Sequence, residues 1–125
     1  MSLHGARVLL ADDDPTTRFV MAEFVRRGGG FPTTTEDGEQ ALARLAAEEF
    51  DVVITDLSMP GASGLVVAER ARARLPHAGV VILTGYADPG LDADVTALGV
   101  ILLRKPARPA ALLDAVTRAL AAAAE

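Results

Sequence analysis

The chain has 125 residues, a length that suits one compact domain with a single core. Half of the residues are hydrophobic and 23% are charged, a composition that excludes a disordered chain, and the absence of cysteine excludes disulfides and thiolate metal sites. The net charge of −5 argues against direct binding of nucleic acid. The sequence has neither a signal-peptide pattern nor an apolar run approaching roughly 20 residues, so we expect a cytoplasmic protein.

Short apolar runs alternate along the chain with stretches of helical spacing. Four runs rich in Val, Ile and Leu do not alternate with polar residues, which is typical of strands buried on both faces of a parallel sheet. A fifth strand must separate the first two helices, and its Pro32 favours a sheet edge because proline cannot donate to a ladder. The expected order is strand 8–11, helix 16–27, strand 31–35, helix 39–49, strand 52–55, helix 64–75, strand 80–83, helix 89–98, strand 100–103 and helix 109–122.

This order predicts a doubly wound α/β domain, (βα)5, with helices on both faces of one parallel sheet. We expect the domain to span residues 1–125, with 1–5 as a leader or tag and 121–125 as the end of the last helix or the start of a linker. Short polar residues before the helices predict N-caps at Asp14, Asp37, Ser63 and Asp88, and the glycines at 28–30 predict the end of the first helix.

Polar residues follow four of the strands, at the edge where ligands bind in such sheets. One Asp after a strand is usually a turn former or a cap, and Asp14, before Pro15, is interpreted as only that. Several carboxylates at one edge repel one another unless a cation joins them, and oxygen ligands without His or Cys favour Mg²⁺. Together with a hydroxyl and an ammonium, these groups can handle a phosphoryl group. The residues concerned are Asp12, Asp13, Asp14, Asp56, Thr84 and Lys105.

Other polar groups give weaker signals. The glycines at 28–30 lack the Lys and Ser/Thr of a phosphate-binding loop. His4 and His77 have no partner in the pattern and are expected to be solvated. The arginines of the third helix are expected to form a solvated face rather than a binding patch; they are Arg70, Arg72 and Arg74.

Four motifs follow one another in a fixed order: Asp12-Asp13, then Asp56-Leu57-Ser58-Met59-Pro60 followed by Gly64, then Leu83-Thr84-Gly85, then Lys105-Pro106. With these motifs the chain resembles the response-regulator receiver domains of two-component signalling over nearly its whole length. Each motif alone is weak, whereas their joint order and spacing are specific. The resemblance implies a flavodoxin-like fold with strand order 2-1-3-4-5.

The resemblance also implies a role for each site residue. Asp56 would accept the phosphoryl group, and Mg²⁺ would be bound by Asp13, Asp56 and the backbone carbonyl of Ser58, with Asp12 acting through water. Thr84 and Lys105 would contact the phosphoryl oxygens, and the Lys105–Pro106 bond would be cis. The implied partners are a sensor histidine kinase or a histidine phosphotransfer protein, a downstream protein or fused output domain, and, on phosphorylation, a second copy of the chain.

The chain departs from the family pattern around the last strand. Leu102 replaces the usual aromatic residue, Ala107 replaces the Phe after Lys-Pro, and the segment from Gly99 to the lysine is one residue shorter. Tyr86, two residues past Thr84, is predicted to slow dephosphorylation by excluding water and to report the phosphorylated state in place of the missing aromatic. The alternative is an ordinary loop aromatic in solvent.

Two other functions fit parts of the pattern. Asp12-Asp13-Asp14-Pro15-Thr16 matches the Asp-x-Asp-x-Thr motif of haloacid-dehalogenase-type phosphatases, in which Asp12 would be the nucleophile. That family needs an acidic pair after the lysine and usually a cap domain, and the chain has neither. A degenerate receiver used only for protein contacts would not need its intact acidic residues. We therefore expect a phosphorylation switch that is not a conventional enzyme.

Overall fold

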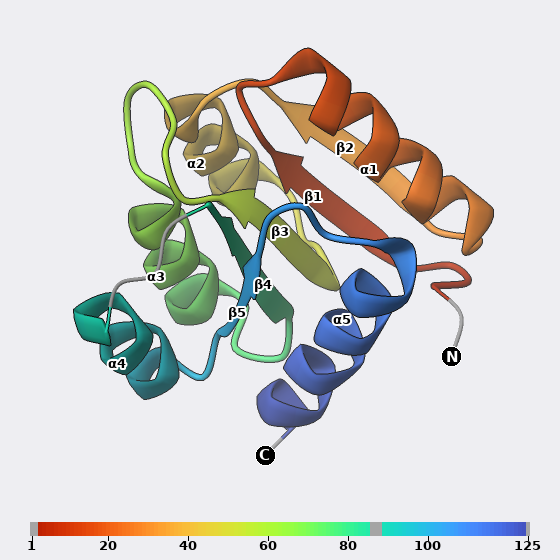
Figure 1. Cartoon of the computed structure of the whole chain (residues 1–125). Helices are drawn as coiled ribbons and strands as arrows, with labels where there is room; N and C mark the ends of the chain where they lie inside the picture. The colour runs from red at the N-terminus through yellow and green to blue at the C-terminus, as the bar shows by residue number, and fades with distance from the viewer. Residues whose placement is uncertain (1–2, 86–88, 125) are drawn as a thin grey trace.

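The computed structural model describes residues 3–85 and 89–124, which form one sheet of five parallel strands covered by five helices (Figure 1). The elements in chain order are β1 (Arg7–Ala11), α1 (Pro15–Arg27), β2 (Phe31–Thr35), α2 (Gly38–Ala47), β3 (Val52–Asp56), α3 (Gly64–Arg74), β4 (Gly79–Thr84), α4 (Pro89–Leu98), β5 (Ile101–Arg104) and α5 (Pro109–Ala124). Within these residues no helix has the length and apolar character needed to cross a membrane.

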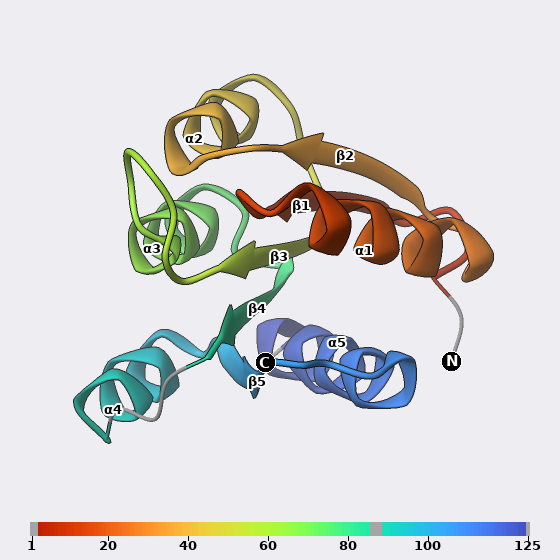
Figure 2. The same ribbon diagram turned by 45° about the horizontal axis from the view of Figure 1, so that its top comes forward.

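The strand order is β2-β1-β3-β4-β5, which confirms the predicted topology. Helices α1 and α5 cover one face of the sheet, and α2, α3 and α4 cover the other (Figure 2). The central strands β3 and β4 are buried along their whole length, whereas β2 and β5 form the edges. Pro32 lies on the edge strand β2 opposite Val8, where its missing N–H leaves no gap in an inner ladder.

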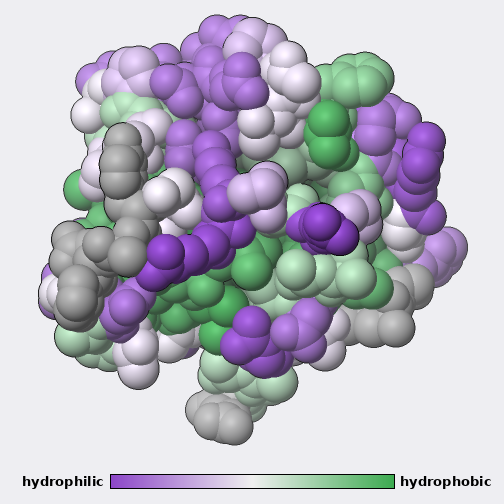
Figure 3. Space-filling view, in the orientation of Figure 1, coloured by the Kyte–Doolittle hydropathy of each residue, from purple (hydrophilic) through white to green (hydrophobic). Residues whose placement is uncertain are grey.

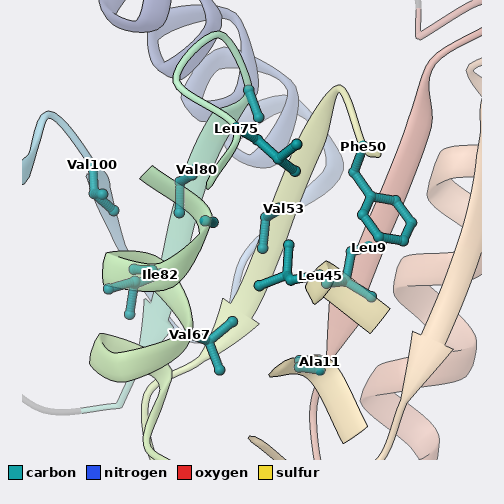
Figure 4. Close-up of a cluster of buried hydrophobic side chains, with 14 of the residues drawn as sticks. Leu9, Ala11, Leu45, Phe50, Val53, Val67, Leu75, Val80, Ile82 and Val100 are labelled. Carbon is teal, nitrogen blue, oxygen red and sulfur yellow. The ribbon is translucent and has the colours of Figure 1, made fainter. Parts of the chain in front are cut away.

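The core has two parts because successive strand residues point to opposite faces of the sheet. Leu9 and Val53 pack with α2, α3 and α4, whereas Val8 and Leu10 pack with α1 and α5. Figure 4 shows the first of these clusters, in which side chains of β1, β3 and β4 meet Leu45 of α2. The sheet is thereby held from both sides, and the ends of its strands have fixed positions.

The helix starts follow the predicted capping pattern. The side chains of Asp14, Asp37 and Ser63 each accept a hydrogen bond from a backbone N–H of the first turn. The Thr17 hydroxyl and amide, which both donate to Asp14, hold the pKa of that carboxyl below its usual value. The predicted cap Asp88 lies outside the described residues. Each cap ties a loop at the carboxyl edge of the sheet to a helix, so these loops have a defined course.

Most expected element bounds differ from the structure by one or two residues, since element ends depend on local packing; the helix expected at 64–75 ends at Arg74, and the strand expected at 100–103 is Ile101–Arg104. Two differences are informative. Helix α2 ends at Ala47, not at residue 49, because Glu48 adopts an extended conformation in which its carboxylate binds the side chains of Arg7 and Arg44. The arginines of α3 do not all form a solvated face. Arg72 donates to the carbonyl of Leu98 at 3.0 Å, and Arg74 donates to that of Leu45, so both side chains tie α3 to neighbouring helices.

The loop between β3 and α3 lies very close to the strand that it leaves. Gly64 donates its backbone N–H to the carbonyl of Leu57 at 2.8 Å, and a Cβ at Gly64 would overlap the carbonyl oxygen of Asp56. Glycine is therefore required at this position by the close approach of two backbone segments. The contact fixes the residues that follow Asp56 against the start of α3.

We predict that Gly64→Ala lowers the free energy of unfolding by about 3 kcal/mol, because the new methyl group collides with backbone that cannot move aside. Gly85→Ala is the matched control, since a Cβ there meets nothing within 4 Å, and its effect should stay below about 0.5 kcal/mol. Urea unfolding of both variants measures the difference. Equal stability of the two variants would contradict the close approach.

Candidate functional site

The carboxyl ends of four strands bring the sequence-predicted residues into one pocket. Asp12 and Asp13 follow β1, and Asp56 is the last residue of β3. One carboxylate oxygen from each of these three residues lies within 4.8 Å of the others. Thr84 ends β4 and Lys105 follows β5, so both belong to the same edge of the sheet. The arrows of the strands in Figure 1 all point toward this edge.

Lys105 lies between the two buried carboxylates of the pocket. Its Nζ is 3.2 Å from Asp12 Oδ2 and 3.2 Å from Asp56 Oδ1. The backbone N–H of Lys105 donates to the carbonyl of Thr84 at 2.8 Å, which joins the exit of β5 to the end of β4. The Lys105–Pro106 bond is cis, which confirms that prediction, and the ammonium points at Asp56.

Asp12 is fully buried, and each of its carboxylate oxygens accepts a hydrogen bond. Its Oδ1 accepts from the backbone N–H of Asp14 at 2.9 Å, and its Oδ2 accepts from Lys105. Its own N–H donates to the carbonyl of Thr35. Asp13, in contrast, is exposed at the mouth of the pocket. The buried acid is therefore held in place by the protein, whereas Asp13 faces solvent.

Charge and burial shift the acid–base properties of the pocket. Burial raises the pKa of the Asp56 carboxyl above its usual value of 3.8, and the neighbouring negative charge of Asp12 raises it further. Burial by itself lowers the pKa of Lys105, but the hydrogen bond and charge of Asp12, together with those of Asp56, outweigh burial and raise this pKa. The ammonium therefore stays protonated, and an ionised Asp56 costs free energy when no cation is bound.

The structure describes two of the remaining predicted residues, Ser58 and Leu102. Ser58 is exposed in the loop after β3, where the N–H of Leu57 donates to the carbonyl of Leu83 at 2.9 Å. Leu102 pairs with Ile82 in the sheet and packs against the core cluster below α2, α3 and α4. Tyr86, the proposed modulator of dephosphorylation, lies outside the described residues.

Sequence reasoning missed one charged residue at the pocket. Arg18 of α1 donates from Nη1 to the backbone carbonyl of Asp12 at 2.8 Å, and its Nη2 lies 3.7 Å from a carboxylate oxygen of Glu36. The only signal in the sequence is an arginine in the first helix shortly after the acidic residues. Its direction depends on how α1 packs against the sheet, which the sequence pattern does not give.

Known proteins share this sequence pattern and this fold. A family model described as the response regulator receiver domain matches residues 8–117. The chain is 38% identical over 117 residues to the transcriptional activator protein ExaE of Pseudomonas putida, covering 91% of this chain and 55% of ExaE. It therefore spans about half the length of this curated relative.

Two solved structures show the same fold. Chemotaxis protein CheY4 of Vibrio cholerae superposes with a TM-score of 0.83 at 29% identity, covering 93% of this chain and 99% of CheY4. A response regulator protein from Burkholderia pseudomallei, solved with a phosphorylated aspartic acid, calcium ion and citrate, has a TM-score of 0.83 at 27% identity, covering 95% of this chain and 71% of that one.

A doubly wound sheet with an acidic triad and a lysine at its carboxyl edge defines a phosphorylation-dependent switch, not a conventional enzyme. The chain belongs to the response regulator receiver domain family. Its acidic triad is typical of the Mg²⁺-binding site of receiver domains. Membership of this family, whose model matches most of the chain, decides against the phosphatase that the Asp-x-Asp-x-Thr pattern allowed.

We predict that Asp56→Asn stabilises the metal-free protein at pH 7, because the amide removes a buried charge whose ionised form the pocket disfavours. The folded-state pKa of Asp56 is raised, so the wild type takes up its proton before the unfolded chain does. The gain from the substitution should therefore shrink as the pH falls toward 3.8 and vanish below it, where the carboxyl becomes neutral in both states. Urea unfolding at pH 7 and pH 4 measures this.

Asp114→Asn is the control, because Asp114 is exposed on α5 and pairs with Arg118 on the same helix. That variant should show no gain at either pH. A wild type as stable as Asp56→Asn at pH 7 would contradict the account of the pocket.

Proposed function

We propose that Asp56 accepts a phosphoryl group from a phosphohistidine of a sensor histidine kinase or a histidine phosphotransfer protein. The observation that carries this proposal is the position of its carboxylate, which lies in the acidic pocket with the Lys105 ammonium 3.2 Å from Oδ1. Receiver domains are phosphorylated by histidine kinases. The phosphorylated aspartic acid of the Burkholderia pseudomallei relative gives further support.

In the proposed reaction an Asp56 oxygen attacks the phosphorus atom of the donor. The bond between phosphorus and the imidazole nitrogen breaks, the nitrogen keeps the electron pair, and an acyl phosphate forms on Asp56. Lys105 and the Thr84 hydroxyl bind oxygens of the transferred group and so orient it. Attack of water on the phosphorus later releases phosphate and restores the carboxylate, so both steps use the domain's own residues.

The residues of the pocket fit Mg²⁺, because they offer carboxylate oxygens and no competing nitrogen or sulfur ligand. We propose Asp13, Asp56 and the backbone carbonyl of Ser58 as its direct ligands. Asp12 acts through water in this proposal, which agrees with the protein donors already present on both of its carboxylate oxygens. The bound ion would neutralise negative charge on the phosphoryl oxygens.

We expect Mg²⁺ to stabilise the fold by relieving the repulsion among the three carboxylates. For a dissociation constant of ~1 mM and ~10 mM metal, mass action gives about 1.4 kcal/mol, which raises the melting temperature by about 5 °C. Thermal melts with and without Mg²⁺ measure this shift. Asp13→Asn should abolish this shift, and Asp114→Asn should leave it intact. A melting temperature that Mg²⁺ does not change would contradict the proposed site.

We predict that a small phosphodonor such as acetyl phosphate adds one phosphoryl group, and that it does so at Asp56. Asp56→Asn keeps the shape of the side chain but removes the nucleophilic oxygen. Intact-protein mass spectrometry should show the added phosphoryl group on the wild type and on Asp114→Asn, and its absence on Asp56→Asn. The same mass increase on Asp56→Asn would show that another residue is the acceptor.

An apolar groove beside the pocket supports docking of the phosphodonor. A groove of about 470 Å³ lies between α1 and α5, and Val20, Phe24 and Leu112 line it together with Lys105. Phe19, which is 65% exposed, lines an adjoining groove that shares Val20 and Phe24 with the first. Val20 is 57% exposed, and Figure 3 shows hydrophobic surface on this face of the molecule. Because the groove shares Lys105 with the pocket, an apolar helix of the donor seated there would hold its phosphohistidine near Asp56.

We predict that Phe19→Asp slows phosphoryl transfer from a histidine kinase at least about tenfold, because a charge replaces an exposed apolar anchor. Labelling by acetyl phosphate should keep the wild-type rate, since that donor needs no docking surface. Phe31→Asp is the matched control, because Phe31 is equally exposed but lies on the edge strand β2. Equal transfer rates for the wild type and Phe19→Asp would contradict this docking surface.

Signal output is proposed to pass through the surface of α4, β5 and α5, which would change its partners on phosphorylation. Strand β5 is an edge strand, and its first three residues are partly exposed. The partner would be a downstream protein, a fused output domain or a second copy of the chain. ExaE, a relative about twice as long, is named a transcriptional activator, which supports an output domain in a longer regulator.

A further inference from the structure

We propose that Arg18 is a positioning residue for the acidic pocket, where it fixes the β1–α1 turn that presents Asp13. The inference rests on the proposed Mg²⁺ role of this pocket. The guanidinium of Arg18 is largely buried, with 17% of its side chain exposed, and Nη1 donates to the carbonyl oxygen of Asp12 at 2.8 Å. Arg18 binds the backbone carbonyl of Asp12, whereas Asp14 and Lys105 donate to its carboxylate, so the effect of Arg18 on a bound ion is exerted through the backbone.

The carbonyl that Arg18 binds lies at the point where strand becomes turn. The N–H of Asp12 still belongs to the sheet, because it donates to the carbonyl of Thr35. Its Oδ1 already accepts the N–H of Asp14 two residues later, and the chain then enters α1. A carbonyl in so closed a setting needs a donor, and Arg18 supplies it from the first turns of the same helix. The peptide groups before and after Asp13 are therefore both held by hydrogen bonds.

The contacts of Arg18 depend on the planar shape of its guanidinium as well as on its charge. While Nη1 binds the carbonyl of Asp12, Nη2 lies 3.7 Å from a carboxylate oxygen of Glu36 in the loop after β2. One planar guanidinium thus joins α1, the end of β1 and the loop after β2, which a lysine ammonium cannot reproduce in the same fixed directions. Glu36 is 67% exposed, so this ion pair orients the guanidinium more than it stabilises the fold.

Positioning and simple charge predict opposite effects on metal binding. A positive charge beside three carboxylates weakens the attraction of the pocket for a cation, so removing a charge with no other role would make Mg²⁺ bind more tightly. Removing a group that holds the turn lets Asp13 move away from Asp56, so Mg²⁺ would bind more weakly. The direction of the change therefore separates the two roles.

The first test measures Mg²⁺ affinity by isothermal titration calorimetry on the wild type, Arg18→Gln and Arg26→Gln. Arg26 is the matched control, because it is exposed on the same helix and pairs with Glu23 at 2.9 Å. We expect Arg18→Gln to bind Mg²⁺ about tenfold more weakly, as is usual when support for a metal ligand is lost, and the control to stay within about twofold. Equal or tighter binding by Arg18→Gln would overturn the proposal.

The second test needs no metal. The N–H of Asp14 is protected by Asp12 Oδ1, so loosening of the turn should speed its exchange with water by about fivefold, the factor expected for one net hydrogen bond. Water-exchange NMR on the metal-free proteins should show this in Arg18→Gln and not in Arg26→Gln. An unchanged exchange rate at Asp14 would overturn the positioning role.

The two tests distinguish a failure of this inference from a failure of the proposed function. A wild type that fails to bind Mg²⁺ would refute the metal role, while exchange at Asp14 would still decide whether Arg18 holds the turn. If Arg18→Gln does not fold, Arg18→Lys replaces it, since it keeps the charge but loses the planar fork. The same two results are expected for Arg18→Lys with smaller factors, and wild-type affinity and exchange in that variant would overturn the proposal.

Discussion

The crowding of three carboxylates at one edge of the sheet is the constraint on which the rest of the site depends. The oxygens of Asp12, Asp13 and Asp56 approach within 4.8 Å, and Lys105 is the ammonium that lies 3.2 Å from both buried acids. Because like charges this close disfavour ionisation, the pKa of Asp56 is raised by burial and by Asp12. The pocket therefore carries an excess of negative charge before a cation or a phosphoryl group enters it.

The protein holds this arrangement by fixing one side of the pocket and leaving the other open. On the closed side, Asp12 is fully buried, and Lys105 is held by the backbone of Thr84. On the open side, Asp13 is exposed, and so is Ser58 in the loop that follows Asp56. The close approach of Gly64 to Asp56 keeps the open loop against the sheet. Some residues are thus held in a fixed orientation, whereas others leave the pocket open to solvent. Fixed orientation of the reacting groups favours transfer of a group between molecules.

Lys105 also connects the two surfaces in the proposed function. It lines the apolar groove between α1 and α5, and it follows directly after the edge strand β5. A donor seated in the groove and a partner on the surface of α4, β5 and α5 would therefore both lie next to Lys105, which is proposed to contact the phosphoryl group. Leu102 packs inward beside Ile82, so a signal through β5 would pass through the packing of aliphatic side chains.

The sequence by itself determined the alternation of strands and helices and the acidic residues and lysine of the pocket, and its resemblance to receiver domains implied the strand order. Runs such as residues 52–55 lack polar alternation because both faces of the sheet are covered, and the polar groups that follow the strands meet because parallel strands end at one edge. Only the tertiary structure decided what Arg18 and Arg72 do. Both are arginines on amphipathic helices, and their sequence pattern is that of a solvated face. Each instead reaches a backbone carbonyl brought near by packing, and the position of that carbonyl depends on residues far along the chain.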